Sequence, residues 1–469
     1  MTSCRSSGGP ALLRVAIVGL GPWGLCALER LLSAVRSGAR ANPGLVVHLI
    51  EPGPPGSGIY DVAQPDYLLL NNACDELSLY PFEDEARQPR YGKGFYDWLA
   101  AQRCCWDPDE CCATGGRPVQ PDDFVARRLM GEYLQWFYRE LVADAPAGVE
   151  LVHHATLGVD LVPRRDGTEE LRLADGRTVL ADHVILTLGH VPNAEPRESP
   201  YRPAHVAPYP VDPYADSLGD GATVAVAGMG LVAVDVVFAL TAGRGGQFVG
   251  NGGALAYRPS GREPTIHLLS RSGLPYTSKP PTRPALAPVV CTPEALAGVS
   301  RSPSIDFRRE VLPLLVREMS ARYYAQAAAQ AGVAPDAATA AEQLRTAHSE
   351  GRFEHELDRL AARLGPFDPE AMFFGRATAH DSPDDYERFA YDAIAADVRE
   401  AQVPNGGSPV KAAAGVFRCG RGWSGPCSKD SAPRWSIPRC WRQLRTMHTR
   451  RGEPRASAST DSGATSAMP

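Results

Sequence analysis

The chain has 469 residues, of which 44% are hydrophobic and 22% charged, and its formal net charge is −6. These values are ordinary for a globular protein of two or three domains, and they exclude global disorder and a bulk electrostatic affinity for nucleic acid or anionic lipid. No stretch approaches the 18 consecutive apolar residues of a membrane-spanning helix, and no targeting signal stands out.

The first predicted unit is a buried strand at residues 12–18, the glycine sequence GLGPWG, and a helix with apolar residues at helical spacing. The three glycines suit a tight turn, the approach of a diphosphate to the backbone, and close helix–strand packing. A second buried strand at 45–52 carries Glu51 at its end, where an acid binds ribose hydroxyls, although the separation from Gly24 is longer than usual. The alternative is a tight turn that binds nothing. The predicted dinucleotide contacts are Gly19, Gly21, Pro22, Trp23, Gly24 and Glu51.

The middle of the chain begins with a loop-rich insertion, residues 53–122, which is rich in Gly, Pro and Asp. An amphipathic helix is predicted at 123–143, followed by two β-rich stretches at 150–164 and 170–189. The segment DHVILTLGHVPN, residues 182–193, is a strand that returns to the first cofactor. Gly189 allows close backbone approach to a ligand, and His190 either faces the cofactor or caps a turn.

A second strand–glycine–helix unit follows at residues 223–241, with Gly228, Gly230 and, at the packing position of the third glycine, Ala233. The next strand, at 265–271, ends in Ser270 and Arg271, where the first unit has an acid. Because arginine accommodates a 2′-phosphate, this unit is predicted to bind NADPH, and the first a dinucleotide without that phosphate. The alternative for Arg271 is an ordinary surface residue in an arginine-rich chain.

Residues 307–402 alternate helical segments with polar connectors, whereas residues 418–469 have no helix or strand period. That tail holds ten Lys and Arg against three acids, which leaves a charge of −13 on the first 417 residues. We expect the tail to be disordered, and a frameshift near codon 418 is our hypothesis for its composition. Eleven cysteines without a CxxC motif indicate a reducing cytoplasm, and CCWDPDECC (104–112) lacks zinc-site spacing, so no metal is expected.

From about residue 12 to 417 the sequence resembles the bacterial FAD-NAD(P)-binding proteins, distant relatives of flavin-dependent N-hydroxylating and Baeyer–Villiger-type monooxygenases. The resemblance is carried, in order, by VAIVGLGPWGLCALERL, GSGIYD, PDYLLLNNA, RRLMGEYLQWFY, VILTLGH, VAVAGMGLVAVDVVFALT, YRPSGREP, SRSGLPY and GGSPVKAA. It implies FAD on the first glycine motif, a nicotinamide nucleotide on the second, and flavin contacts from Tyr60, Asn71 and Asn72. The alternative for those three residues is turn and cap chemistry.

The resemblance also implies the fold: α/β, with two Rossmann-like dinucleotide-binding units and a mostly helical region. The expected domains are an FAD-binding domain (12–220), an NAD(P)-binding domain (221–290), a mostly helical region completing the fold (291–417), and the tail (418–469). Similarity stops near residue 418, and no C-terminal segment that would complete the FAD domain is recognisable after it.

The expected function is an FAD-dependent, NADPH-using oxidoreductase of the cytoplasm, and the leading hypothesis is a monooxygenase acting on a small nucleophile such as an amine. Cofactors carry such chemistry, which fits the lack of a recognisable acid–base pair in the sequence. Two alternatives stay open: an NAD(P)H-dependent flavin dehydrogenase or reductase, and an inactive nucleotide-binding remnant. The catalytic residues and the identity of the small-molecule substrate are not readable, and no motif indicates an oligomeric state.

Overall fold

The computed structural model describes residues 12–38, 44–81, 92–107, 112–189, 208–209, 211, 218–251, 254–270, 273–279, 286–301, 304–374, 380–403 and 407–414. The chain divides into two compact units. Unit 1 is Met1–Thr282 with Ala379–Arg399, and unit 2 is Arg283–Thr378 with Glu400–Pro469. The tail at 418–469, predicted to be disordered and out of frame, lies outside the described residues.

The centre of unit 1 is a four-stranded parallel sheet with the order β5-β2-β1-β9. The first predicted strand pairs with the second along its whole length, from Leu13 opposite Leu45 to Val18 opposite Ile50. This order, with the first strand between its successor and a later strand, is that of a dinucleotide-binding unit. The four strands are β1 (Leu13–Val18), β2 (Leu45–Ile50), β5 (Val149–His154) and β9 (His183–Leu186).

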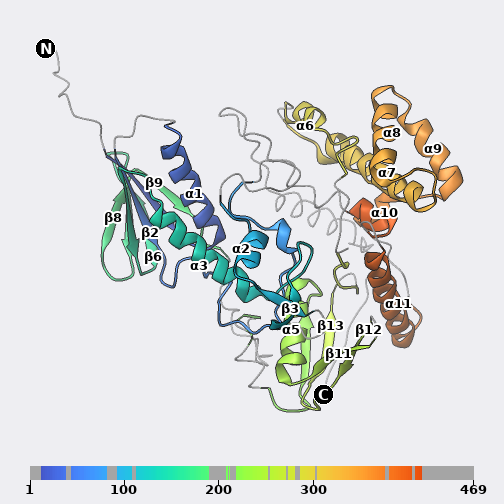
Figure 1. Cartoon of the computed structure of the whole chain (residues 1–469), viewed down its shortest axis with the longest axis horizontal. Coiled ribbons are helices and arrows are strands. Elements are labelled where there is room, and N and C mark those ends of the chain that lie inside the picture. The colour runs from blue at the N-terminus through green and yellow to red at the C-terminus, as the bar shows by residue number, and fades with distance from the viewer. Residues whose placement is uncertain are drawn as a thin grey trace, which may run out of the picture. The chain divides into compact units, whose positions relative to one another are not determined.

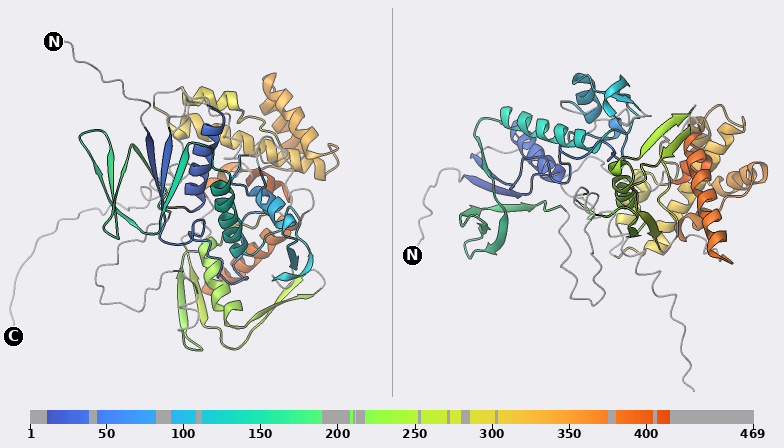
Figure 2. Two further views of the ribbon diagram at one scale, coloured as in Figure 1. Left: turned by 60° about the vertical axis from the view of Figure 1, so that its left-hand side comes forward. Right: turned by 90° about the horizontal axis from the view of Figure 1, so that it is seen from below.

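Both faces of this sheet are covered, which explains why its two central strands, β1 and β2, are mostly apolar and buried. Val15 and Ile17 face a core shared with α1 (Pro22–Arg36) and α3 (Arg127–Ala143), two helices that Figure 2 shows side by side. Ala16 and Val18 face an antiparallel sheet that covers the other side (Figure 1). Its strands are β6 (Gly158–Pro163), β7 (Glu169–Leu173) and β8 (Thr178–Ala181).

The insertion at 53–122 contains short elements that have no readable period in the sequence. In α2, Phe95, Trp98 and Leu99 are buried, and the rings of Phe95 and Trp98 contact Tyr133 of α3. A helix of seven residues spans two turns, too few to establish a helical period. The elements are η1 (Cys74–Glu76), α2 (Phe95–Ala101), β3 (Cys105–Asp107) and β4 (Cys112–Pro118).

The helix predicted at 123–143 begins at Arg127, four residues later than expected. The preceding residues are extended, because Leu70 N–H donates to Val125 O at 2.9 Å and Arg127 N–H donates to Leu68 O at 2.7 Å. Backbone pairing with residues 68–70 therefore delays the start of the helix to Arg127, although the amphipathic pattern begins earlier.

The second strand–glycine–helix unit has β10 (Thr223–Ala227) and β13 (Thr265–Leu269) paired in parallel, with α5 (Leu231–Leu240) between them in sequence. A hairpin, β11 (Gln247–Asn251) and β12 (Ala254–Arg258), and a short helix, η2 (Ala242–Arg244), complete this part. The helix α11 (Pro383–Gln402) returns to unit 1 for most of its length. The expected α/β class with two Rossmann-like units is confirmed.

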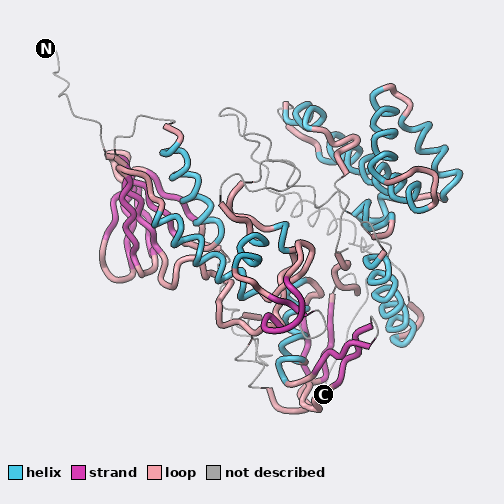
Figure 3. Tube along the Cα trace, viewed as in Figure 1, coloured by secondary structure: helices cyan, strands magenta, loops and turns pink. Residues whose placement is uncertain are grey.

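The described residues of unit 2 are mostly helical, as the sequence predicted (Figure 3). Its core is formed by α7, α8 and α9 through residues such as Ala325, Leu344 and Leu360. The helices are α6 (Pro293–Ser300), η3 (Phe307–Val311), α7 (Leu312–Gln330), α8 (Ala337–Ser349), α9 (Phe353–Leu364), α10 (Pro369–Phe374) and α12 (Pro409–Ala414). Among the helices described in either unit, none combines the length and apolar character required to cross a membrane.

Two histidines in the central sheet make the stability of unit 1 dependent on pH. His48 Nδ1 and His154 Nε2 lie 3.0 Å apart, and burial lowers the pKa of both imidazoles. In the unfolded chain these histidines have pKa values of about 6.5. As the pH falls, the unfolded chain therefore takes up protons at a higher pH than the folded chain does. The contribution of these two neutral imidazoles to stability is fully present above about pH 6.5 and is lost as the pH falls through their lowered pKa values in the folded chain.

We therefore expect the apparent Tm to fall on the order of a few degrees between pH 7.5 and 5.5, and the double variant His48→Gln/His154→Gln to reduce that fall. Thermal unfolding followed by circular dichroism over this pH range measures the effect. His267→Asn, at an exposed position on β13, is the matched control and should leave the slope as it is. An unchanged slope in the double variant would assign the pH dependence to other groups.

Candidate functional site

The first glycine turn lies at the carboxyl end of β1, and packing alone requires two of its glycines. Gly19 has a φ of +93°, and a Cβ there would lie 2.4 Å from the carbonyl oxygen of Thr187. A Cβ on Gly24 would lie 2.0 Å from the carbonyl oxygen of Gly19. These positions match the turn and packing roles that the sequence predicted for them.

Gly21 differs because, apart from Gly21 itself and its two chain neighbours, no heavy atom of the described residues lies within 4 Å of the position of its missing Cβ. It is the N-cap of α1, with extended backbone, and it has no side chain with which to cap the helix. Pro22 occupies the first turn, and Trp23 beside it is 77% exposed. A helix amino terminus that no side chain caps offers its N–H groups to a diphosphate, so the turn is suited to a dinucleotide such as FAD.

Glu51 follows β2 at the same edge of the sheet, as predicted. Its Oε2 accepts the N–H of Leu20 at 2.8 Å, and its Oε1 accepts the N–H of Gly53 at 3.3 Å. The carboxylate therefore fixes the glycine turn from the neighbouring strand. Each carboxylate oxygen can accept a second hydrogen bond, so ribose recognition remains chemically available to it.

The GSGIYD segment lies against the glycine turn. Gly56 N–H donates to Leu20 O at 2.9 Å, and the missing Cβ of Gly58 would lie 3.6 Å from Gly21 Cα. Tyr60 follows with a half-buried ring, and burial raises the pKa of its phenol. The carbonyl of Tyr60 packs on α3, where a Cβ on Gly131 would lie 2.0 Å from its oxygen. The segment is thus held beside the first dinucleotide turn.

Asn71 and Asn72 take part in a charged cluster that sequence reasoning missed. Asn72 Nδ2 donates to Glu76 Oε2 at 2.9 Å, and Lys279 Nζ donates to Asn71 O at 2.6 Å and Glu76 Oε2 at 3.2 Å. Glu76 is only 4% exposed. The only sequence signal for this cluster was the rarity of lysine, because Lys279 is one of four lysines among the 48 Lys and Arg residues of the chain.

The segment after β9 returns to the first glycine turn. Thr187, which the sequence analysis did not single out, donates through its Oγ1 to Gly19 O at 2.6 Å and to Val18 O at 3.0 Å. Gly189 has a φ of +67°, in the left-handed region. His190 lies outside the described residues, so its predicted role is a sequence-based expectation only.

The second glycine turn repeats the backbone conformation of the first. Gly228 has a φ of +115° and donates its N–H to Leu269 O at 2.7 Å, while Gly230 is the N-cap of α5 with extended backbone. Ala233 is buried, and its N–H donates to Gly230 O at 3.0 Å. Ser270 follows β13 directly, whereas Arg271 lies outside the described residues.

A buried ion pair connects the two dinucleotide-binding parts of unit 1. Arg127 Nη2, at the start of α3, donates to Asp235 Oδ2 of α5 at 2.6 Å, and the hydroxyl of Tyr209 donates to the same oxygen. Burial, together with this hydrogen bond to Asp235, raises the pKa of Tyr209. Within the described residues, no three His, Cys, Asp or Glu side chains gather as a metal site.

Comparison with known proteins agrees with this geometry. The FAD-NAD(P)-binding family profile matches residues 16–191, which include the end of β1, the first glycine turn and the other three strands of the parallel sheet. Over 440 residues the chain is 31% identical to the L-aspartate N-monooxygenase (nitrosuccinate-forming) of Streptomyces cremeus. That alignment covers 87% of this chain and 65% of the relative, so the chain spans slightly less than two thirds of that protein's length.

Over 469 residues it is 30% identical to the nitrosuccinic acid synthase of Aspergillus oryzae, covering 90% of this chain and 68% of the relative. Among solved structures, cyclohexanone monooxygenase from Rhodococcus sp. Phi1 bound to NADP+ matches 62% of this chain and 42% of its own. The two chains share 15% sequence identity over this match, with a TM-score of 0.30.

Proposed function

Because the chain belongs to the FAD-NAD(P)-binding family, we propose that it is an FAD-dependent, NADPH-using monooxygenase that oxygenates the amine of a small amino acid. The observation that carries the proposal is the pair of glycine turns, each at the start of a helix and each on a parallel strand pair. L-Aspartate is the first substrate to test, because a relative 31% identical over 87% of this chain is an L-aspartate N-monooxygenase.

The proposed division of work assigns binding and orientation to the protein and electron transfer to the cofactors. FAD, when bound, would take two electrons from NADPH and pass them to molecular oxygen, which is the oxidant of the amine. The amino end of α1 at Gly21 would hold the diphosphate of FAD, and Glu51 would keep the turn in shape through the Leu20 N–H. The amino end of α5 at Gly230 would hold the diphosphate of NADPH in the same way.

In the first oxygenation, one atom of O2 is inserted into an N–H bond of the amine and the other is released as water. One NADPH and one proton are consumed. The test incubates the flavin-loaded protein with NADPH and L-aspartate and measures oxygen uptake, hydrogen peroxide and the oxygenated product by mass spectrometry. Succinate, which lacks the amine, is the matched control. L-Glutamate, which has one more methylene group, tests whether the length of the substrate side chain matters. We expect oxygen uptake to be matched by product with L-aspartate alone.

Two other outcomes would each overturn this proposal in a recognisable way. Oxygen uptake that is matched by peroxide with every amine identifies an NAD(P)H-dependent flavin reductase. Protein that purifies colourless and cannot be reconstituted with FAD identifies a nucleotide-binding remnant. The absorbance spectrum of the purified chain separates the remnant from both enzymes before any substrate is added.

The preference for NADPH is proposed to come from Arg271, which follows the strand of the second unit where an acid would select NADH. A charge-assisted hydrogen bond to the 2′-phosphate is worth about 1.5–3 kcal/mol. We therefore expect Arg271→Ala to lower the ratio of kcat/KM for NADPH over NADH about ten- to a hundredfold. Arg258, an exposed arginine at the end of β12, is the control position for the same substitution. If the ratio is unchanged in Arg271→Ala, Arg271 does not select NADPH and is an ordinary surface residue.

A further inference from the structure

A short segment after β13, residues 273–279, is fixed at several points along its length. The hydroxyl of Tyr386 on α11 donates to Gly273 O, and Ser278 N–H donates to Asp397 Oδ2, also on α11. Between these anchors, Tyr276 N–H donates to Met229 O of the second glycine turn at 3.2 Å. At the end, Lys279 forms the hydrogen bonds to Asn71 and Glu76 described above. We call residues 273–279 the strap.

The strap holds the ring of Tyr276 against the second glycine turn. The Cε2 and hydroxyl atoms of Tyr276 lie 3.6 and 3.9 Å from the position of the missing Cβ of Gly230. Tyr276 is nevertheless 66% exposed, and its hydroxyl makes no hydrogen bond to another described residue. A large aromatic ring is thus kept at the amino end of α5 by its backbone, without being buried there.

We propose that Tyr276 is a contact for the nicotinamide dinucleotide, a role that rests on the proposed function of the second glycine turn. The diphosphate of a dinucleotide lies at the amino end of the helix in such a unit, which is where this ring is held. The phenolic O–H donates a charge-assisted hydrogen bond to a phosphate oxygen, and the ring shields the diphosphate from water. Because the strap is anchored before the ligand arrives, little conformational freedom is lost on binding.

The test measures the affinity of the FAD-loaded full chain for NADP+, which binds without a redox step, by isothermal titration calorimetry. We expect Tyr276→Phe, which removes only the hydroxyl, to weaken binding about tenfold, and Tyr276→Ala to weaken it further. Tyr391, on α11, is also 66% exposed and is the matched control. Tyr391→Phe and Tyr391→Ala should bind NADP+ as the parent protein does. Flavin absorbance and Tm of each variant verify that the fold and the first site are retained.

The outcomes separate this inference from the function on which it rests. If the unsubstituted protein binds NADP+ and the Tyr276 variants bind it with an affinity within twofold of that value, the role of Tyr276 is overturned. The proposed dinucleotide site is then retained. Parent protein that binds neither NADP+ nor NAD+ would overturn the proposed dinucleotide site and this inference with it. Equal losses at Tyr276 and Tyr391 would also overturn the inference, because the effect would then not depend on the glycine turn.

Discussion

Replacing Gly21 with valine is expected to give a folded protein that purifies without flavin. The missing Cβ of Gly21 points into space that no described heavy atom occupies within 4 Å, and its backbone is extended rather than left-handed. Valine therefore fits the apo fold at a small cost in N-cap preference. The new side chain would occupy the place of the diphosphate at the amino end of α1. Losing two charge-assisted hydrogen bonds there weakens FAD binding on the order of a hundredfold or more.

The ratio of flavin to protein absorbance and a titration of apoprotein with FAD measure this effect. Gly219→Val is the matched control, since that glycine also has open space at its Cβ and lies outside both glycine turns. Gly24→Val is a contrasting variant, because its Cβ would lie 2.0 Å from the carbonyl oxygen of Gly19 and the turn itself must shift. Full flavin content in Gly21→Val would mean that FAD does not use this turn.

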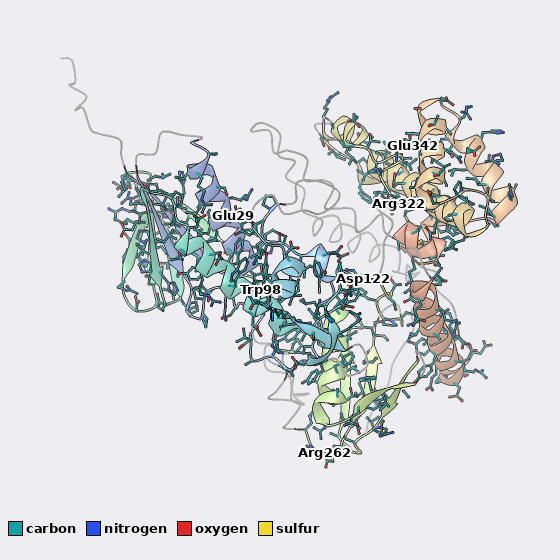
Figure 4. The ribbon with its side chains drawn as sticks, viewed as in Figure 1. Glu29, Trp98, Asp122, Arg262, Arg322 and Glu342 are labelled. Carbon is teal, nitrogen blue, oxygen red and sulfur yellow. The ribbon has the colours of Figure 1, made fainter. Side chains whose placement is uncertain are left out.

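The second large effect is expected in unit 2, where Glu318→Ala should destabilise the helical core by about 3–5 kcal/mol. Glu318 is 1% exposed, and its Oε2 accepts the N–H groups of Val289, Val290 and Cys291 at 2.9, 2.7 and 3.1 Å. Its Oε1 accepts from Arg322 Nε at 2.9 Å. Arg322, labelled in Figure 4, lies on the same helix α7. Removing the carboxylate leaves three buried N–H groups unsatisfied and the guanidinium charge unpaired.

Urea unfolding followed by far-UV circular dichroism measures this loss, with the transition of unit 2 identified by limited proteolysis. Glu354→Ala is the matched control, because Glu354 pairs with Arg317 of the same helix but its side chain is 69% exposed. An exposed pair contributes about 0–1 kcal/mol, so this variant should stay close to the parent. Equal, small effects of both substitutions would show that the buried carboxylate does not hold the 286–291 segment.

The sequence by itself determined the parts of this protein that follow from local rules. A buried strand, a glycine turn and a helix are encoded within about 25 consecutive residues, so both dinucleotide-binding units and their glycines were readable. The helical character of unit 2 was readable for the same reason, because its helices α7, α8 and α9 are each twelve residues or longer. Short elements such as α2 were not readable, because seven residues establish no period.

Only the tertiary structure decided which residues from separate segments of the chain meet. Thr187 on Gly19, Lys279 on Glu76 and Tyr276 on Gly230 join segments separated by up to about 200 residues, and none of these pairs has a fixed spacing that a motif could express. The start of α3 at Arg127 was likewise decided by backbone pairing with residues 68–70, which outweighs the local helical preference. Local helix and strand propensities contribute only tenths of a kcal/mol per residue. The contacts named here form only when distant segments are brought together by the complete fold, so a local pattern does not predict them.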